Sequence, residues 1–265
     1  MPGIRPPAVA GMFYPADPRE LEAYVRGILA DAVREVPELG DVRAVVAPHA
    51  GYVYSAPVAA HAYAALARAA GGEVRRIVLM GPAHTVPLRG IAAPAWDGFA
   101  TPLGVVPVDV AARQAIAVLP QVTVDDLPHA REHSLEVQLP FLQVLFPDVP
   151  VLPLVVGEAT PEEVAEVMEA LDDGHTLFVI SSDLSHYEPY DSARAHDAHT
   201  ARLVEALDHA HLSPTDACGA RPLAGLLLEA RRHGWRPHLL DLRNSGDTAG
   251  DPSRVVGYGA WAFAA

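Results

Sequence analysis

The sequence predicts an α/β fold with a central, mostly parallel or mixed sheet flanked by helices on both faces. Short runs of β-branched and aliphatic residues alternate along the chain with longer segments whose apolar residues recur every three or four positions. The short runs lack polar alternation, which is typical of strands buried on both faces. Hydrophobic residues make up 50% of the 265, enough for a substantial core, and no linker or internal repeat interrupts the pattern. We therefore expect one domain over residues 1–265.

The N-terminal part of the chain predicts two helices and two strands. At residues 17–20 an N-cap aspartate precedes a proline and, three positions on, a glutamate, which is typical of a helix start. Buried strands are expected over residues 42–47 and 77–80. Between them, residues 55–57 open an alanine-rich helix that should end at Gly71-Gly72.

Residues 90–108 depart from this pattern and predict an antiparallel insertion, because short apolar runs there surround turn residues. The alternation then resumes, and Pro140 is expected to kink a helix that includes Leu139 and Leu142. A capping box is expected at residues 160–163. The later strands are expected over residues 151–156, 177–180, from 239 onward and 255–263, and the later helices over residues 110–119, 160–171, 191–207 and 222–234.

The composition excludes several classes of function. The formal net charge is −14 and no basic cluster occurs, so nucleic acid and anionic membranes are poor partners. Lysine is absent, which rules out Schiff-base chemistry and a lysine-dependent phosphate loop. Cys218 is the only cysteine, so no internal disulfide can form and a reducing compartment is indicated. With no apolar signal core and no run of about 18 apolar residues, we expect a cytoplasmic protein.

Reactive side chains gather where the predicted strands end. His49, His84 and Asp183 each follow a different strand, His186 comes close behind Asp183, and Asp247 follows a fourth strand. Ligands bind outside the carboxyl ends of strands in open α/β sheets, so these groups converge if the strands are parallel neighbours. Two imidazoles and one carboxylate with open positions are the ligand set of non-haem Fe(II) oxygenases, and zinc hydrolases use similar donors. The set predicts a divalent metal site; the alternative is a polar cleft without metal.

Other reactive residues allow a structural and a functional interpretation. Tyr52 and Tyr54 either pack in the core or line a pocket, and alternation along an extended loop would put both rings on the same side. Glu132 and His133 are an adjacent acid and base that either reach the cleft or form a helix cap. Cys218 precedes a helix start, where the pKa of a thiol can fall, but a buried packing role is the simpler interpretation. Neither Gly-x-Ser-x-Gly nor Gly-x-Gly-x-x-Gly follows a strand, so acyl transfer and dinucleotide binding have no support.

Six segments of the chain resemble, in order, the signatures of one protein family. They are Arg5-Pro6-Pro7-Ala8-Val9-Ala10-Gly11-Met12-Phe13-Tyr14-Pro15, Ala47-Pro48-His49-Ala50-Gly51-Tyr52, Gly81-Pro82-Ala83-His84, Glu132-His133-Ser134-Leu135-Glu136, Ser181-Ser182-Asp183-Leu184-Ser185-His186 and Cys218-Gly219-x-x-Pro222. On these motifs the chain is identified as a member of the Memo family, called AmmeMemoRadiSam system protein B in prokaryotes. The resemblance implies a fold similar to class III extradiol ring-cleaving dioxygenases, with a metal pocket in the position of their Fe(II) site.

The resemblance also implies roles for individual residues. His49 and His84 match the two histidine ligands, and Asp183 and His186 match pocket residues that in the related dioxygenases would supply a base. Eukaryotic members place a cysteine ligand in the segment that corresponds to residues 244–248, where this chain has none.

We choose Asp247 as the third metal ligand. A carboxylate beside two imidazoles favours Fe(II) or Mn(II), and Gly246 would let the backbone turn tightly enough to aim it. Two alternatives stay open: His186 is the third ligand, or Asp247 only caps an ordinary surface turn.

Two hypotheses of function follow. In the first, the protein is a mononuclear iron oxidoreductase in which His186 moves a proton and Asp183 orients its imidazole. Fe(II) is the expected metal, with Mn, Cu or Zn as other candidates. Tyr52, Tyr54 and His133 are the expected substrate-binding residues for an unknown small molecule. In the second, the protein is a binding module whose cleft accepts a partner protein's terminus or loop, with metal as a structural or redox adjunct. The family resemblance implies an AMMECR-type protein and a radical-SAM protein as partners.

Overall fold

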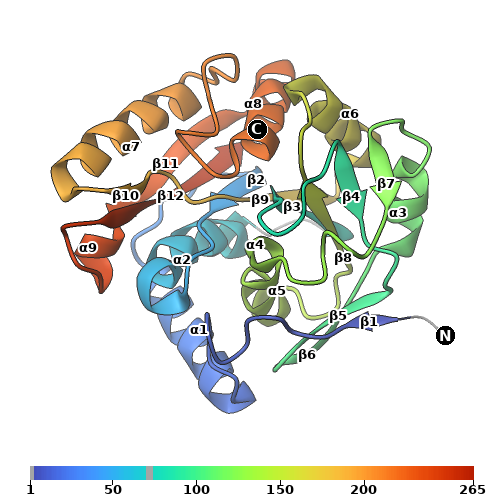
Figure 1. Cartoon of the computed structure of the whole chain (residues 1–265), viewed down its shortest axis with the longest axis horizontal. Coiled ribbons are helices and arrows are strands. Elements are labelled where there is room, and N and C mark those ends of the chain that lie inside the picture. The colour runs from blue at the N-terminus through green and yellow to red at the C-terminus, as the bar shows by residue number, and fades with distance from the viewer. Residues whose placement is uncertain (1–2, 70–73) are drawn as a thin grey trace.

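The structure is a computed structural model that describes residues 3–69 and 74–265, and its helices and strands alternate along the chain (Figure 1). The strands are β1 (Ile4–Arg5), β2 (Val42–Ala47), β3 (Arg76–Pro82), β4 (Ile91–Ala93), β5 (Gly98–Thr101), β6 (Gly104–Pro107), β7 (Val122–Val124), β8 (Val151–Val156), β9 (Thr176–Ser181), β10 (His186–Glu188), β11 (Arg236–Asn244) and β12 (Val255–Ala264). The helices are α1 (Pro18–Ala32), α2 (Tyr52–Ala69), α3 (Val110–Ile116), α4 (His133–Glu136), α5 (Leu139–Leu145), α6 (Pro161–Leu171), α7 (Tyr190–Glu205), α8 (Ala220–His233) and α9 (Ser245–Thr248).

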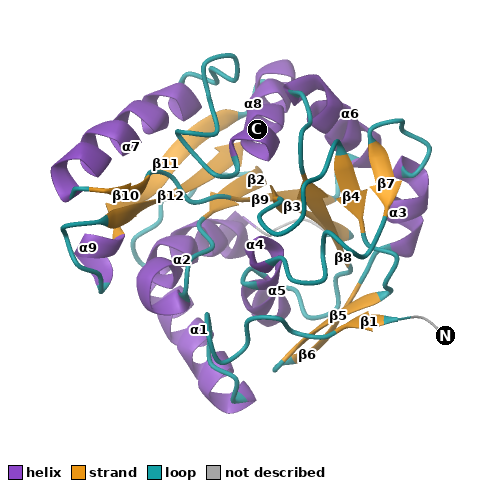
Figure 2. Cartoon of the chain, viewed as in Figure 1, coloured by secondary structure: helices purple, strands orange, loops and turns teal. Residues whose placement is uncertain are grey.

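The main sheet is mixed. Within the described residues it has nine strands, in the order β10-β12-β2-β9-β3-β8-β4-β7, with β11 paired to β12. The central strands β2, β9, β3 and β8 are parallel to one another, whereas β12 runs antiparallel to both β2 and β11, and β4 antiparallel to β8. Helices lie on both sides of this sheet (Figure 2). The α/β fold with a flanked mixed sheet that the sequence predicted is confirmed.

The central strands are apolar because helices exclude water from them. Every residue of β8 and β9 is buried, as is every residue of β2 except the half-buried Arg43. On α1 the residues Leu21, Val25 and Leu29 form the buried face, and Asp17 caps the helix by accepting from two backbone N–H groups. The unalternated runs and the three-to-four spacing in the sequence thus correspond to two-sided and one-sided burial.

Two helix predictions need correction. α2 begins at Tyr52 and not at Ser55, because the Gly51 carbonyl already accepts from the backbone N–H of Ser55 at 3.1 Å. Its expected end at Gly71-Gly72 lies outside the described residues. Pro140 does not kink one helix: α4 and α5 are separate, and the proline lies in the first turn of α5, where its missing N–H has no intrahelical partner to lose.

The antiparallel insertion is confirmed for β5 and β6, which form a hairpin; β5 also pairs in parallel with β1, giving a second, three-stranded sheet. β4, from the same stretch of sequence, joins the main sheet instead. Among the described helices, none has the length and apolar character needed to cross a membrane.

Candidate metal centre

Three strand ends meet at one edge of the main sheet. β2, β9 and β3 are parallel neighbours, so His49, Asp183 and His84, which follow them, are brought to the same edge. Cys218, from just before α8, joins the two histidines. The ligand atoms of His49, His84 and Cys218 all lie within 4.8 Å of one another. We call these three residues the donor cluster.

Hydrogen bonds determine which nitrogen of His49 is protonated. Ser181 Oγ donates its single proton to the Ser134 carbonyl at 2.6 Å and accepts from Gln138 Nε2 at 2.8 Å. Nδ1 of His49, 2.9 Å from the same oxygen, must therefore be a donor. Its Nε2 keeps a lone pair that faces Cys218 Sγ at 3.2 Å. Burial lowers the pKa of His49 well below its usual value, so the imidazole is neutral, which is the form that binds metals.

His84 is held by a buried carboxylate. Its backbone N–H donates to Glu132 Oε2 at 2.6 Å, and its Nδ1 donates to Oε1 at 2.8 Å. Glu132 also accepts from the Ser134 N–H at 3.0 Å. Burial would raise the pKa of Glu132, but the hydrogen bond and the charge of His84 lower it to about 2, so the carboxylate is ionised. This contact protonates Nδ1. Burial alone would lower the pKa of His84, but the hydrogen bond and the charge of Glu132 raise it, so a metal at Nε2 would displace the second proton of the imidazole.

Cys218 was assigned to packing from the sequence, and the structure places its thiol against an imidazole. Sγ also accepts from the Asp183 N–H at 3.3 Å. Burial and the Asp183 carboxylate raise the pKa of the thiol to about 12. A bound cation would reverse this preference for the protonated thiol, because a thiol that coordinates a metal is deprotonated. The close approach depends on Gly219, where a Cβ would lie 2.6 Å from the Cβ of Ser182. That Cys-Gly pair is the sequence signal that could have identified the thiol.

The donor set fits a divalent transition metal. Nδ1 of His49 is held by the Ser181 hydroxyl, and Nδ1 of His84 by the Glu132 carboxylate. Metal-binding histidines almost always make such a contact through the nitrogen that does not bind the metal. Imidazole and thiolate suit iron, copper and zinc, whereas magnesium and calcium would require oxygen donors. These residues could therefore bind a metal.

Asp183 and His186 lie beside the donor cluster. The sequence predicted that Asp183 orients the His186 imidazole, but each residue makes its hydrogen bond to another group. Asp183 Oδ1 accepts from the His49 N–H at 2.7 Å and so holds the loop after β2; burial raises the pKa of this carboxyl to about 7. His186 Nδ1 lies 2.7 Å from the Leu184 carbonyl, which orients the imidazole. Desolvation and the charge of His84 lower the pKa of His186.

His133 is the predicted substrate-binding residue that lies nearest to the donor cluster. Its ring stacks on His84, with centroids 4.8 Å apart, and meets His49 edge-on at 5.5 Å. Together with His84 and Glu132 it forms a second group of candidate ligands. Desolvation lowers the pKa of His133, against the opposing effect of the Glu132 charge. The ring thus forms one wall of the site.

Tyr52 and Tyr54 do not share one side. Tyr52 is buried, and its hydroxyl donates to the Val137 carbonyl at 2.7 Å, whereas Tyr54 is 38% exposed. Both lie in the first turn of α2, where residues two apart face different directions, so the alternation expected of an extended loop does not apply. Tyr52 is a core residue, and Tyr54 belongs to the surface near the His49 loop.

Asp247 lies outside the donor cluster. It accepts from the Asn244 N–H at 2.9 Å in a capping box at α9, and from the hydroxyl of Tyr190. β12 separates β11 from β2, and strands pair about 4.8 Å apart, so β11 and β2 lie roughly 10 Å apart across the sheet. The end of β11 also lies further along, because Asn244 pairs with Gly257 of β12 whereas Val46 of β2 pairs with Trp261. The structure favours the turn-cap interpretation, and the third candidate donor beside His49 and His84 is Cys218.

Comparisons with known proteins show which family the chain belongs to. A model of the Memo-like protein family matches residues 5–262. A MEMO1 family protein from Methanopyrus kandleri is 39% identical over 281 residues, covering 98% of each chain, and one from Metallosphaera sedula is 34% identical, covering 98% of this chain and 99% of that protein. An uncharacterized Escherichia coli K12 protein of known crystal structure has a TM-score of 0.49 and 14% identity, covering 83% of this chain and 99% of that one. Because the family match and the relatives span nearly the whole chain, the protein belongs to the Memo family.

Proposed function

We propose that the protein binds a divalent transition metal, with iron(II) as the first candidate, through His49, His84 and Cys218, and that it is a dioxygenase-like oxidoreductase acting on a small molecule. The observation that carries the proposal is the convergence of three ligand atoms within 4.8 Å of one another. The fixed protonation of both imidazoles supports it. Manganese, copper and zinc are the competing metals, and the thiol favours copper and zinc over manganese.

Iron(II) in this donor set would supply the chemistry of O2 activation and of one-electron transfer. The chain's own residues supply positioning and proton transfer. Glu132 and Ser181 hold the two imidazoles in orientation, and Asp183 fixes the loop that carries His49. His186 donates from Nδ1 to the Leu184 carbonyl, which leaves Nε2 as the atom that can accept a proton from a substrate.

Metal content tests the proposal directly. Protein purified without an affinity tag or chelator, then loaded anaerobically with Fe(II), should hold one metal ion per chain by elemental analysis, and His49→Ala/His84→Ala should hold none. His211→Ala is the matched control, because that imidazole is exposed and, among the described residues, pairs only with Asp208. Equal metal in the wild type and the double variant would refute the site.

The third donor is tested by competition. Cys218→Ser should weaken Fe(II) and Zn(II) binding, with the larger loss for zinc, because a hydroxyl is a poor substitute for a soft thiolate. Asp247→Ala should bind both metals as the wild type does. The reverse pattern would restore Asp247 as the ligand.

Turnover is tested by O2 consumption with iron-loaded protein and a panel of catechols and other small aromatics. His186→Gln should slow turnover while metal content stays unchanged, because it removes a proton acceptor and no ligand. No consumption above that of free iron, in protein that holds the metal, would refute the oxidoreductase and leave the metal site standing.

A second candidate function is a non-catalytic interaction module that works with AMMECR-type and radical-SAM partners. It is favoured by large exposed apolar side chains next to the His49 loop: Val53 is 61% exposed and Tyr54 38%. Co-purification of a partner should be lost in Tyr54→Ala and retained in Val118→Ala, an 82% exposed control on another surface. Since a free thiol ligand requires a reducing compartment, we place either activity in the cytoplasm.

A further inference from the structure

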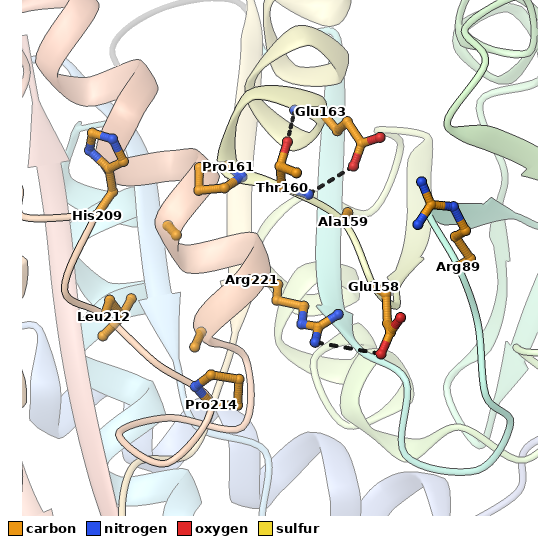
Figure 3. A pocket seen from close by; sticks show the side chains of 12 residues that line it. Arg89, Glu158, Ala159, Thr160, Pro161, Glu163, His209, Leu212, Pro214 and Arg221 are labelled. Carbon is orange, nitrogen blue, oxygen red and sulfur yellow. Dashed lines mark hydrogen bonds and ion pairs between the residues drawn. The ribbon is translucent and has the colours of Figure 1, made fainter.

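A second cavity, of about 430 Å³, lies apart from the donor cluster (Figure 3). The loop from β8 to α6, the first turns of α8 and the loop before α8 line it, and no donor-cluster residue is among its lining residues. Its volume falls within the range of small-molecule sites, roughly 300–1,000 Å³. The metal proposal assigns no role to this cavity.

Charged groups lie at one end of the cavity, where Arg89 and Arg221 come from different elements with Glu158 between them (Figure 3). Arg221 donates to the Gly157 carbonyl at 3.2 Å, but its distance to the Glu158 carboxylate is 3.9 Å, at the limit of an ion pair. Glu158 is 74% exposed, so the pair is weak and can open. In the described part of the chain, the guanidinium of Arg89 makes no hydrogen bond or ion pair.

Apolar side chains line much of the rest of the cavity, together with Thr160 and His209. Ala159 and Pro161 come from the β8–α6 loop and Leu212 and Pro214 from the loop before α8, and Ala224 of α8 also lines the cavity. Glu163, the other acidic residue of the lining, belongs to the capping box of α6, where its carboxylate accepts from the Thr160 N–H at 2.8 Å. The cavity therefore combines two guanidinium groups with an apolar surface, and a single loosely held carboxylate competes for the charge.

We propose that this cavity binds a small organic anion, a carboxylate or a phosphate monoester with a short apolar body. The anionic group lies between Arg89 and Arg221, in the position that Glu158 occupies loosely, because guanidinium groups hold both kinds of anion through paired charged hydrogen bonds. The apolar body lies against the proline and leucine side chains. Glu158 turns out to solvent when the ligand enters.

Calorimetric titration with phenyl phosphate and phenylacetate tests the site and separates the two anion classes, since the tighter of the two names the class. Arg221→Gln should weaken the preferred probe about tenfold, and Glu158→Gln should strengthen it, because the competing carboxylate is gone. Arg236→Gln, an exposed arginine elsewhere, should leave affinity unchanged. His49→Ala/His84→Ala should also bind normally, which separates this site from the donor cluster.

Several results would overturn the proposal: no saturable binding of either aryl anion, equal binding of neutral benzyl alcohol, or equal losses in Arg221→Gln and Arg236→Gln. Binding of inorganic phosphate as tight as that of phenyl phosphate would also overturn it, because the apolar walls would then contribute nothing. An unchanged melting temperature of Arg221→Gln without ligand establishes that the variant is folded.

Discussion

Glu132 and Glu136 are two buried carboxylates four residues apart, and they differ in what their partners leave free. Glu132 is 1% exposed and Glu136 is 0% exposed. Glu136 accepts from a guanidinium, a phenol and two backbone N–H groups, which belong to Arg5, Tyr14, Ala8 and Val9. Glu132 accepts from Ser134 and twice from His84. One carboxylate joins the N-terminal segment to the fold, and the other holds a candidate ligand.

The difference follows from the partners and not from the carboxylates. Arg5 is fully buried and donates to Glu136 and to the carbonyls of Pro6, His129 and Glu132, so its guanidinium is engaged within the fold. An imidazole has two nitrogens, and holding one of them leaves the other directed elsewhere. A buried acid therefore becomes part of a functional site when its partner has an unused atom.

The largest effect is expected from Glu136→Gln, which leaves the charge of buried Arg5 uncompensated. It should lower the free energy of unfolding by about 3–5 kcal/mol, measured by urea denaturation. Glu22→Gln, at an exposed pair with Arg26, is the control and should change little. A loss as small as that of the control would show that the Glu136 network is not what joins the N-terminal segment to the fold.

A bound metal should stabilise the fold through His84, the partner of Glu132. At about 100 times its dissociation constant, Fe(II) should add about 2.7 kcal/mol to the unfolding free energy. The increment should vanish in His84→Ala and persist in Glu136→Gln wherever that variant is folded. Thermal melts with and without chelator measure it, and an equal increment in His84→Ala would contradict the ligand assignment.

Glu132→Gln should weaken metal binding by about 10- to 100-fold. The amide has one oxygen and cannot accept from both the backbone N–H and Nδ1 of His84 as the two carboxylate oxygens do, so it no longer keeps the proton on Nδ1. Anaerobic Fe(II) titration measures the change. If Glu136→Gln, at equal folded fraction, lost the same affinity, the two carboxylates would not differ in function and the comparison would fail.

The smallest effect concerns His196, an imidazole with both nitrogens occupied, Nδ1 by Glu188 at 2.7 Å and Nε2 by Asp216 at 3.0 Å. The Glu188 hydrogen bond, with that of Asp216, raises the pKa of His196 above its usual 6.5. A raised folded pKa gives stability that is complete below about pH 6.5 and is lost as the pH rises through the folded value.

His196→Gln should therefore cost about 1 kcal/mol or less near pH 6 and less still at pH 8.5, by urea denaturation at both values. Metal content should not change, unlike in His84→Ala. A cost that grew with pH would contradict the sign of the shift.

The sequence predicted the features that depend on residues near one another in the chain. The capping box at Thr160 is present because its two hydrogen bonds join residues three apart. His49 and His84 follow buried strands because such strands need unbroken apolar runs, and these runs are visible in the chain. The β5–β6 hairpin is likewise a local pairing around a turn.

Only the tertiary structure decided which strand ends are neighbours. Cys218 lies 169 residues from His49 in the chain, and it meets that imidazole because the segment before α8 packs against the end of β9. Asp247 follows a strand end as His49 does, yet β12 inserts between β11 and β2 and keeps it away. Strand order is set by packing of the whole sheet and not by local pattern, so the sequence identified the two candidate histidines and only the structure brought Cys218 beside them as a candidate donor.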